Sequence, residues 1–214
     1  MVTHQRRKIL CLEPCRRVLR EVIRKTQARY PFTIDAFVLL PDHLHCIWTL
    51  PERDTNYSMR WGFIKKEFTR KVRGIIGDAE IAGMAEMEMV GTAHPTASPG
   101  MGGYAHQNGS LKRRVGCAHQ RERATISAHY NHSRKKHRES TVWQRRFWEH
   151  TIRDQADFNA HVEYIHYNPV KHGYVQAPKD WEYSSFHRYV SKGIYPVDWG
   201  GGQEIRFDEG IGRE

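Results

Sequence analysis

Two stretches in the first third of the chain carry apolar residues at the three-to-four-residue spacing of an amphipathic helix. The first runs from Glu13 to about Arg29, and the second runs from about Tyr57 to Arg73. The apolar stripes consist of Val18, Val22 and Ile23 in the first stretch and of Trp61, Ile64 and Phe68 in the second. Each stripe needs an apolar surface to cover it, so we expect both helices to pack on a sheet.

Between these helices the pattern changes to that of extended chain. Phe32–Leu40 and His43–Leu50 favour two strands, and Pro41-Asp42 between them predicts a tight turn, so the pair forms a hairpin. A further strand is predicted far downstream, around Arg146–Ile152. Helices packed on one face of an antiparallel sheet indicate an α+β domain.

Two histidines stand two residues apart in the second predicted strand. Side chains at i and i+2 of a strand leave the same face, so His43 and His45 can direct both imidazoles at one point. Two neutral imidazoles suit a divalent metal and leave coordination positions open for substrate oxygens. An isolated His-x-His pair is more often polar surface, so a metal site requires another group to converge on it.

A third helix, which follows the downstream strand, supplies such groups. Asp154 is its expected N-cap, and Asn168-Pro169 is its expected end, because proline disfavours helical geometry in the preceding residue. The residues at core spacing are Phe158, Val162 and Ile165. Tyr164 and Asn168 are four residues apart, so a hydroxyl and an amide oxygen are presented on neighbouring parts of one face.

Four segments are specific when taken together and in order, namely Pro41–Trp48, Arg146–His150, Tyr164–Gly173 and Asp180–Arg188. With them the chain resembles the single-tyrosine HUH transposases and, within these, the REP-associated tyrosine transposases of bacteria. The resemblance spans most of residues 4–73 and 143–200 and implies a ferredoxin-like antiparallel sheet. Relatives carry an additional first strand before the segment that matches Thr3–Leu10, and that strand is missing from this sequence.

The resemblance implies a transposase and single-strand endonuclease that cleaves and rejoins hairpin DNA of the REP type. Tyr164 attacks a phosphodiester and becomes joined to the 5′ end, which leaves a free 3′ hydroxyl. His43, His45 and Asn168 hold Mg²⁺ or Mn²⁺, which polarises the scissile phosphate. Spacing also favours Tyr164 over Tyr167, which we expect to pack or stack. For Asn168 the competing interpretation is a helix C-cap.

The charge of the chain fits a nucleic-acid partner, because 34 Lys and Arg against 24 Asp and Glu give a net charge of +10. The basic groups expected to bind single-stranded or hairpin DNA are Lys65, Lys66, Arg70, Lys71, Arg145, Arg146, Lys171, His172 and Arg188. The aromatic residues interleaved with them are Trp143, Trp148, Tyr167 and Phe186, and we expect about half of these to stack bases and half to fill the core. His161 and His166 are expected at the surface or facing DNA.

The chain divides by composition. Residues 1–73 and 141–200 are expected to be two parts of one transposase domain, residues 74–140 a disordered insertion, and residues 201–214 a flexible C-terminus. The four cysteines show no pairing motif, and the sequence has no signal peptide or apolar run of membrane length. We therefore expect a cytoplasmic protein with reduced thiols and no membrane partner.

Two other functions remain open at this point. One is a catalytically inactive DNA-binding protein that acts on repeated palindromic hairpins, which the missing strand and the long insertion favour. The other is an RNA-binding module, because a small sheet with aromatic residues can stack RNA bases equally well. Metal dependence separates these functions from a transposase. The sequence does not distinguish a monomer from a homodimer.

Overall fold

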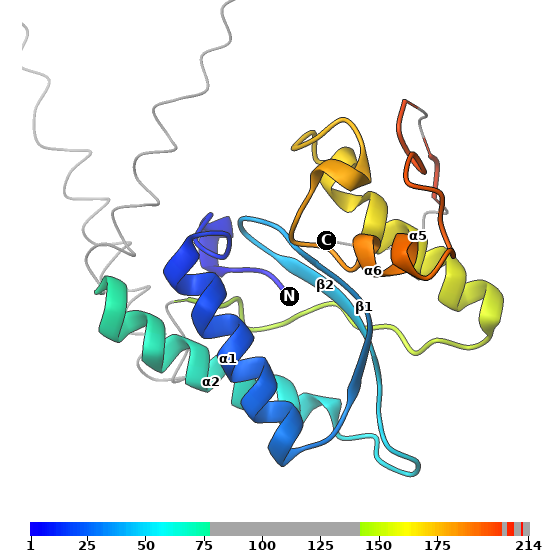
Figure 1. The fold of residues 1–214 in the computed structure, drawn as a ribbon. Helices are drawn as coiled ribbons and strands as arrows, with labels where there is room; N and C mark the ends of the chain where they lie inside the picture. The colour runs from blue at the N-terminus through cyan, green and yellow to red at the C-terminus, as the bar shows by residue number, and fades with distance from the viewer. Residues whose placement is uncertain (78–141, 203–204, 208–210, 212–214) are drawn as a thin grey trace, which may run out of the picture.

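A two-stranded antiparallel sheet lies at the centre of the computed structural model, which describes residues 1–77, 142–202, 205–207 and 211 (Figure 1). Strand β1 (Thr33–Leu39) pairs with strand β2 (Leu44–Thr49). Val38 lies opposite His45 in the register, and Leu39 lies opposite Leu44 next to the turn. The predicted hairpin is therefore confirmed, with each strand slightly shorter than the sequence pattern indicates.

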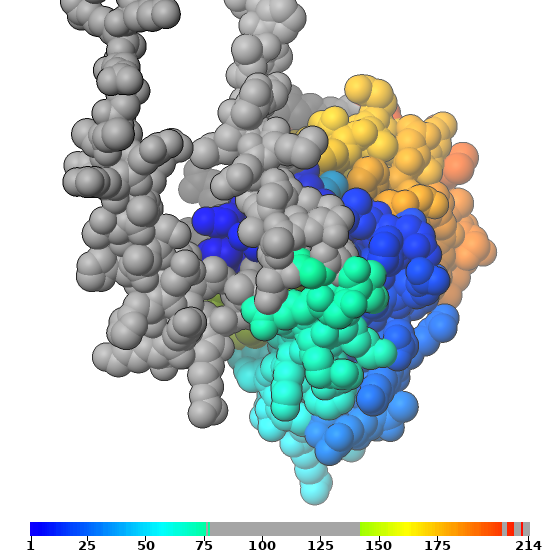
Figure 2. All heavy atoms as spheres, turned by 90° about the vertical axis from the view of Figure 1, so that its left-hand side faces the viewer, coloured from blue at the N-terminus to red at the C-terminus, as the bar shows by residue number. Residues whose placement is uncertain are grey.

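Helices α1 (Glu13–Arg29) and α2 (Tyr57–Ile76) lie side by side on one face of this sheet (Figures 1 and 2). Both predicted helices are confirmed, and α2 continues to Ile76 instead of ending at Arg73. Asn56 caps the start of α2, because its side chain accepts a hydrogen bond of 3.1 Å from the backbone N–H of Met59. Gly77 ends the helix with a φ of 75°, a conformation that glycine adopts without strain.

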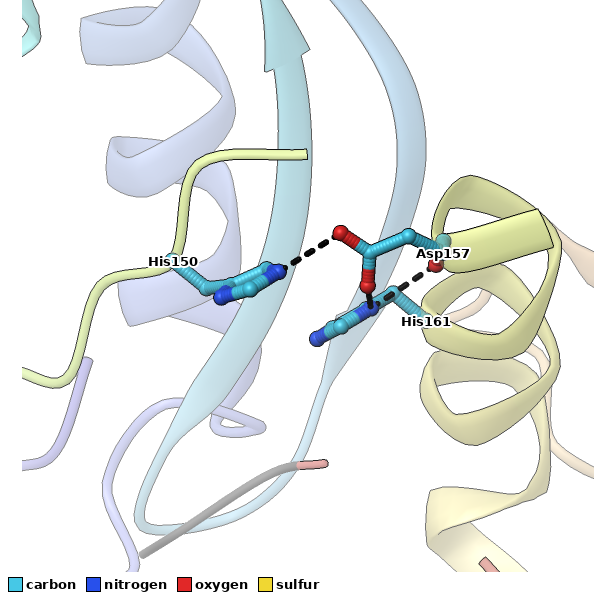
Figure 3. A group of neighbouring side chains, drawn as sticks. All are labelled: His150, Asp157 and His161. Carbon is cyan, nitrogen blue, oxygen red and sulfur yellow. Dashed lines mark hydrogen bonds and ion pairs between the residues drawn. The ribbon is translucent and has the colours of Figure 1, made fainter. Parts of the chain in front are cut away.

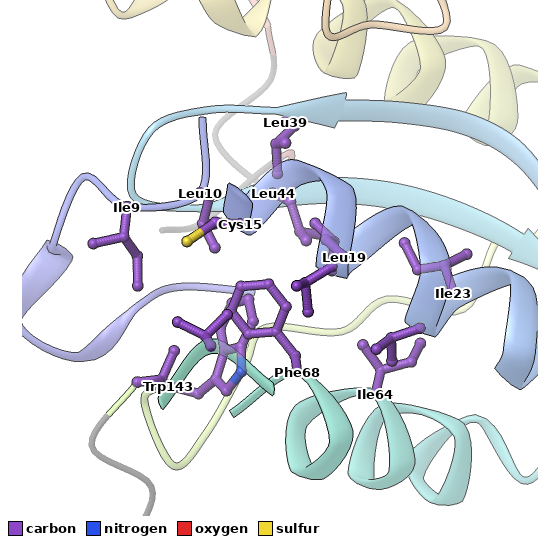
Figure 4. Packing of buried hydrophobic residues seen from close by; sticks show 14 of the residues in the cluster. Ile9, Leu10, Cys15, Leu19, Ile23, Leu39, Leu44, Ile64, Phe68 and Trp143 are labelled. Carbon is purple, nitrogen blue, oxygen red and sulfur yellow. The ribbon is translucent and has the colours of Figure 1, made fainter. Parts of the chain in front are cut away.

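The main hydrophobic core lies between α1, α2 and the sheet (Figure 4). Phe68 and Ile64 of α2 are fully buried there, and the ring of Trp143 packs 5.1 Å from that of Phe68. Trp143 follows the undescribed segment, so the parts of the chain before and after that segment share one core. The other members include Leu10, Leu19, Val22, Leu39, Leu44, Val72 and Val142.

Helix α5 (Gln155–Lys171) covers the other face of the sheet, together with the short helices η3 (Pro178–Asp180) and α6 (Phe186–Ser191). A second cluster of buried residues joins them and consists of Ala36, Val38, Leu40, Val162 and Ile165. The expectation of helices on one face was therefore wrong. Both alternating sets of side chains on β1 are apolar, so both of its faces need cover.

A β-bulge interrupts the pairing of β1 between Ile34 and Ala36. Because of it, Ile34 packs on the α1 side while Ala36 packs on the α5 side. The guanidinium of Arg188 donates hydrogen bonds to the carbonyl groups of Ile34 and Asp35. Arg188 was expected to contact DNA; in the structure its guanidinium satisfies the backbone at this bulge.

The first residues of the chain lie along the end of β2 and lead into a short 3₁₀ helix, η1 (His4–Arg6). Met1 and Leu44 exchange two hydrogen bonds of 2.8 Å, and Val2 makes an isolated bridge with His43. Further along β2, a pocket of about 680 Å³ separates the strand from residues 147–152, which line it. The strand predicted around Arg146–Ile152 is wrong, because no strand of the described residues lies against this segment to form a ladder.

The expected insertion, residues 74–140, lies outside the described residues except for its start, which continues α2. Among the described residues, Cys11, Cys15 and Cys46 are free thiols. Burial raises the pKa of Cys15 to about 11 and that of Cys46 to about 12, so both stay protonated at neutral pH. None of the described helices combines the length and the hydropathy that a membrane crossing needs.

Arg60 connects the end of α1 to the start of α2 from a position that is only 1% exposed. Its guanidinium pairs with the carboxylate of Asp54 at 2.6 Å and donates to the carbonyl groups of Tyr30, Pro31 and Asn56 at 3.3, 2.8 and 2.9 Å. This single planar group therefore satisfies backbone acceptors of two loops.

We expect Arg60→Met to lower the free energy of unfolding by about 3–5 kcal/mol, because it leaves these acceptors and Asp54 without their donor. Urea unfolding followed by circular dichroism measures the loss. The matched control is Arg17→Met, since the Arg17 side chain is 71% exposed and pairs with Glu13 one turn away, and we expect a change within about 0.5 kcal/mol there. Equal losses in the two variants would contradict this role of Arg60.

Candidate active site

The two histidines of the hairpin face helix α5. His45 lies opposite Val38 in the sheet, and Val38 belongs to the core cluster on the α5 side. The imidazole rings of His43 and His45 have centroids 5.1 Å apart and are nearly perpendicular. His43 is buried and His45 is half-buried. The structure thus brings the two predicted metal ligands together on one face.

The carboxylate of Asp42 orients His43. Its Oδ1 lies 2.7 Å from Nδ1 of His43, and its Oδ2 lies 3.3 Å from Nη1 of Arg6. Burial raises the pKa of Asp42, but the hydrogen bonds and charges of His43 and Arg6 outweigh it and hold this pKa below its ordinary value. An ionised carboxylate at Nδ1 favours the tautomer that leaves Nε2 as the ligand nitrogen.

Helix α5 begins as predicted but ends later. The side chain of Asp154 accepts a hydrogen bond of 2.8 Å from the N–H of Asp157, which confirms it as the N-cap. The predicted end at Asn168-Pro169 was wrong, because the helix includes Pro169 and continues to Lys171. Proline in this last turn removes one backbone donor, while the N–H of His172 still bonds to the Asn168 carbonyl at 3.0 Å.

The phenol of Tyr164 lies beside the histidine pair. Its ring centroid is 5.6 Å from that of His45, and the two rings are perpendicular. The ammonium of Lys171 donates a hydrogen bond of 2.8 Å to the phenolic oxygen. Lys171 was expected to contact DNA. In the structure its ammonium instead contacts Tyr164, the candidate nucleophile, which lies seven residues earlier in the same helix. Because the helix extends past Pro169, it also brings His172 to within 5.0 Å of the His43 ring.

The side chain of Asn168 is fully buried, and neither its Oδ1 nor its Nδ2 has a hydrogen-bond partner among the described residues. A buried amide left in this state costs about 1–3 kcal/mol per group, so it calls for an explanation. Its carbonyl group, not its side chain, accepts the hydrogen bond from the N–H of His172, which disfavours the C-cap role. An amide oxygen beside two imidazoles fits the donor set that Mn²⁺ or Mg²⁺ accepts.

Burial of two histidines on α5 corrects the expectation for them. His161 and His166 lie in the interior and not at the surface, whereas Tyr167 packs as expected. Nε2 of His166 lies 2.7 Å from Oγ of Ser185, and the same oxygen accepts from the N–H of Phe37 at 2.8 Å. Burial, followed by the charges of Arg188 and His187, lowers the pKa of His166 to about 3.

The predicted DNA-contacting residues do not form one patch. Lys65, Lys66, Arg70 and Lys71 belong to α2, which covers the face of the sheet opposite α5. Lys65 donates to the carbonyl of Gln144 at 3.1 Å, and Arg70 and Lys71 pair with Glu67 and Glu21. The exposed basic residues of the predicted set are Lys66, Arg70, Arg145, Arg146, Lys171 and Arg188.

The pocket beside β2 holds both His45 and Tyr164 in its lining. Its aromatic members are Trp48, Tyr57, Trp61, Phe147 and Trp148, and the rings of Trp48 and Trp61 stack with centroids 4.3 Å apart. Of the four aromatic residues interleaved with the basic groups, three lie in the core instead of the expected half, namely Trp143, Tyr167 and Phe186. Only Trp148 is open to solvent, with 39% of its surface exposed.

The sequence analysis missed a group that could hold a metal ion, formed by His150, Asp157 and His161 (Figure 3). The four-residue spacing of Asp157 and His161 in a helix was visible in the sequence. His150 precedes the N-cap, and nothing in the sequence pattern shows that it lies against the first turn of α5.

The comparisons with known proteins agree with this architecture, although no family model matches the chain. The chain is 37% identical over 187 residues to a protein of Haemophilus influenzae assigned to the REP-associated tyrosine transposases. This match covers 87% of this chain and 77% of that protein. It is 36% identical over 184 residues to the REP-associated tyrosine transposase of Escherichia coli K12, and this match covers 86% of this chain and 72% of that protein.

A solved structure of a REP-associated tyrosine transposase bound to a REP hairpin is also similar, with a TM-score of 0.61 and 33% identity. The match covers 100% of this chain and 89% of that one. The chain therefore belongs to the family of REP-associated tyrosine transposases.

The buried His166 makes stability depend on pH in a calculable way. In the folded protein its ring stays neutral down to about pH 3, whereas in the unfolded chain it protonates below about pH 6.5. The unfolded state binds more protons between these values, so the free energy of unfolding falls as the pH falls. From pH 7 to 5.5 we expect this group to contribute a loss of about 1 kcal/mol.

Urea unfolding at several pH values in this range measures the effect. His166→Gln should flatten the slope, while the same substitution at the exposed His187 should leave it as in the wild type. A slope that does not change in His166→Gln would contradict a neutral, buried imidazole.

Proposed function

We propose that this protein is a metal-dependent transposase and single-strand endonuclease that cleaves and rejoins hairpin DNA of the REP type through a 5′-phosphotyrosine. The observation that carries the proposal is the position of Tyr164 in one pocket with His45, with the ammonium of Lys171 2.8 Å from the phenolic oxygen. A nucleophile with a cation on its oxygen and one imidazole of the pair thus meet at a pocket that is open to a substrate.

Tyr164 is the nucleophile in this proposal. Its phenolic oxygen attacks the phosphorus of a phosphodiester, a P–O bond to tyrosine forms, and the bond to the 3′ oxygen breaks. The 3′ oxygen leaves as a hydroxyl after it takes up a proton. The phosphotyrosine keeps the ester bond, so the reverse attack by a 3′ hydroxyl rejoins DNA without a nucleotide cofactor.

Lys171 assists the attack. A positive charge in hydrogen-bond contact with the phenolic oxygen stabilises the negative charge that develops there as the proton leaves. The same helix carries both groups, so their distance is fixed by the helical repeat and does not depend on a loop.

His43, His45 and Asn168 are the proposed ligands of Mg²⁺ or Mn²⁺. The residues fit a cation, because Asp42 orients His43 and the buried amide of Asn168 has no other partner among the described residues. When bound, the metal would polarise the scissile phosphate and stabilise the charge of in-line displacement.

The proposed substrate is a hairpin with an adjoining single strand. The similar structure described above is of a transposase bound to a REP hairpin. In this chain the exposed Arg145 and Arg146 immediately precede the pocket-lining residues Phe147 and Trp148, so phosphates and unpaired bases can be bound by one segment. We propose that His172, whose ring lies 5.0 Å from that of His43, extends this contact to the duplex.

One observation favours the second candidate, a DNA-binding protein without catalysis. The sheet of the described residues has two strands, whereas the resemblance implies a larger, ferredoxin-like sheet. An altered sheet could leave Tyr164 misaligned while DNA binding remains, so the decisive experiment must measure binding and cleavage separately.

We expect Tyr164→Phe to bind REP-type hairpin DNA as the wild type does but to form no covalent adduct, because it lacks only the attacking oxygen. The assay incubates each protein with hairpin DNA labelled at the 5′ or 3′ end, with Mg²⁺, Mn²⁺ or EDTA, and resolves denatured products. With the wild type and metal, the 3′-labelled fragment should migrate with the protein, and the 5′-labelled fragment should be released.

Tyr167→Phe is the matched control, since this neighbouring tyrosine packs against Trp199 and Phe207 and should leave the adduct unchanged. An adduct that persists in Tyr164→Phe would refute the assignment of the nucleophile. Binding without any adduct in the wild type, with either metal, would support the non-catalytic alternative.

We expect Lys171→Gln to slow adduct formation by about 10–100-fold at neutral pH, because a charge-assisted hydrogen bond contributes about 1.5–3 kcal/mol. Raising the pH should recover part of the rate in this variant, since hydroxide then assists removal of the phenolic proton. Lys179→Gln, which removes an exposed lysine of η3, is the control for loss of net charge. Single-turnover rates separate this effect from DNA affinity, and equal slowing in both variants would contradict a role at the phenol.

A further inference from the structure

The first turn of α5 and the segment before it carry two imidazoles and a carboxylate that are not used in the proposed mechanism. His150, Asp157 and His161 each offer one ligand atom, and these three atoms lie within 4.8 Å of one another (Figure 3). Two imidazoles and one carboxylate form a donor set that binds first-row divalent cations, zinc above all, and leaves further positions open.

Asp157 is the centre of the cluster. Its Oδ2 lies 2.8 Å from Nε2 of His150, and its Oδ1 lies 3.1 Å from Nδ1 of His161. The hydrogen bond with His150, together with those from Arg153, outweighs burial and holds the pKa of Asp157 well below its ordinary value. The cluster therefore contains a buried, ionised carboxylate at neutral pH.

His161 provides the independent sign of a ligand site. Its Nδ1 lies 2.8 Å from the carbonyl oxygen of Asp157 one helical turn earlier, and a carbonyl can only accept, so Nδ1 carries the proton. Its Nε2 then presents a lone pair, and this atom is buried with no hydrogen-bond partner among the described residues. The residue is only 7% exposed. An imidazole that is oriented by a carbonyl at one nitrogen and orphaned at the other is arranged as metal-binding histidines are.

The cluster must rearrange to bind an ion, and the pocket beside β2 gives the ion a route to enter. The rings of His150 and His161 stack with centroids 4.5 Å apart and planes within 10°. A zinc ion with ligand bonds of about 2.0–2.2 Å needs ligand atoms roughly 3–3.5 Å apart. Because the two rings are parallel and Asp157 bonds to Nδ1 of His161, the rings must rotate as well as approach before Nε2 of His161 can share an ion with the other two groups. The His150 side chain is 27% exposed and lies on a segment without regular structure, so it can move. Both histidines line the pocket that also holds Tyr164, which gives an ion access.

We propose that His150, Asp157 and His161 bind a zinc ion that fastens the segment before α5 to the first turn of that helix. The site shares no residue with the proposed ligands His43, His45 and Asn168. Water or another oxygen ligand from the pocket would complete the coordination of the ion.

The test is a calorimetric titration of the full-length protein, stripped of metal with a chelator, with zinc chloride alone. The His43→Ala/His45→Ala double variant serves as the background, so that the other candidate site does not contribute. We expect this variant to bind one zinc ion. Adding His150→Ala should weaken that binding by about 100-fold or more, since loss of even an outer-shell partner costs 10–100-fold.

His187→Ala in the same background is the matched control, because His187 is an exposed histidine outside both clusters, and we expect zinc binding there to be unchanged. His150 lies outside any helix or strand, so its removal should leave the circular dichroism spectrum intact, and a second variant, His161→Gln, should also lose the ion. Cobalt(II) absorption gives a readout that does not depend on activity, because a visible spectrum with nitrogen ligation should vanish with His150→Ala. A double variant that binds no zinc, or zinc binding that survives both changes, would overturn the proposal and leave the cluster as a hydrogen-bonded cap of α5.

Discussion

The candidate site depends on the register of one hairpin. Leu44, Cys46 and Trp48 of β2 pack towards α1 and α2, so the alternate positions, His43 and His45, must face α5. A slip of one residue would move every side chain of β2 to the opposite face. The burial of these apolar side chains in the main core thus determines the face to which the imidazoles of His43 and His45 point. The core residues Leu44, Cys46 and Trp48 therefore also orient the two histidines of the candidate site.

Helix α5 is the second determinant, because it carries almost everything that meets the histidines. Its sheet-facing residues Val162 and Ile165 hold it against β1, and His166 adds a polar connection through Ser185 to the backbone of Phe37. With the helix anchored in this way, Tyr164 and Lys171 have little freedom relative to His45. Asn168 lowers the stability of this arrangement, because its side-chain amide is buried without a partner among the described residues.

Much of this could be predicted from local patterns. The extents of α1, the hairpin, the cap at Asp154 and the convergence of His43, His45 and Tyr164 follow from periodicity, turn residues and the family resemblance. The failures involve tertiary context. Whether residues 146–152 form a strand depends on a neighbouring strand, which no single segment encodes.

The burial of individual side chains could not be predicted from their spacing in the sequence. A histidine has the same letter whether it is exposed or in the interior, so His161 and His166 were misplaced and the cluster around Asp157 was missed. Lys171 and Arg188 are basic in the sequence, but the structure shows their nearest acceptors to be a phenol and two carbonyl groups.

The contact between Phe68 and Trp143 has a consequence for the length of the chain. It closes a loop that begins near the end of α2 and returns at residue 142, so folding must bring these ends together whatever sequence lies between them. The entropy of closing a flexible loop rises only with the logarithm of its length, and each doubling costs about 0.6 kcal/mol. The core can therefore absorb large changes in the number of residues between positions 77 and 142 at small cost.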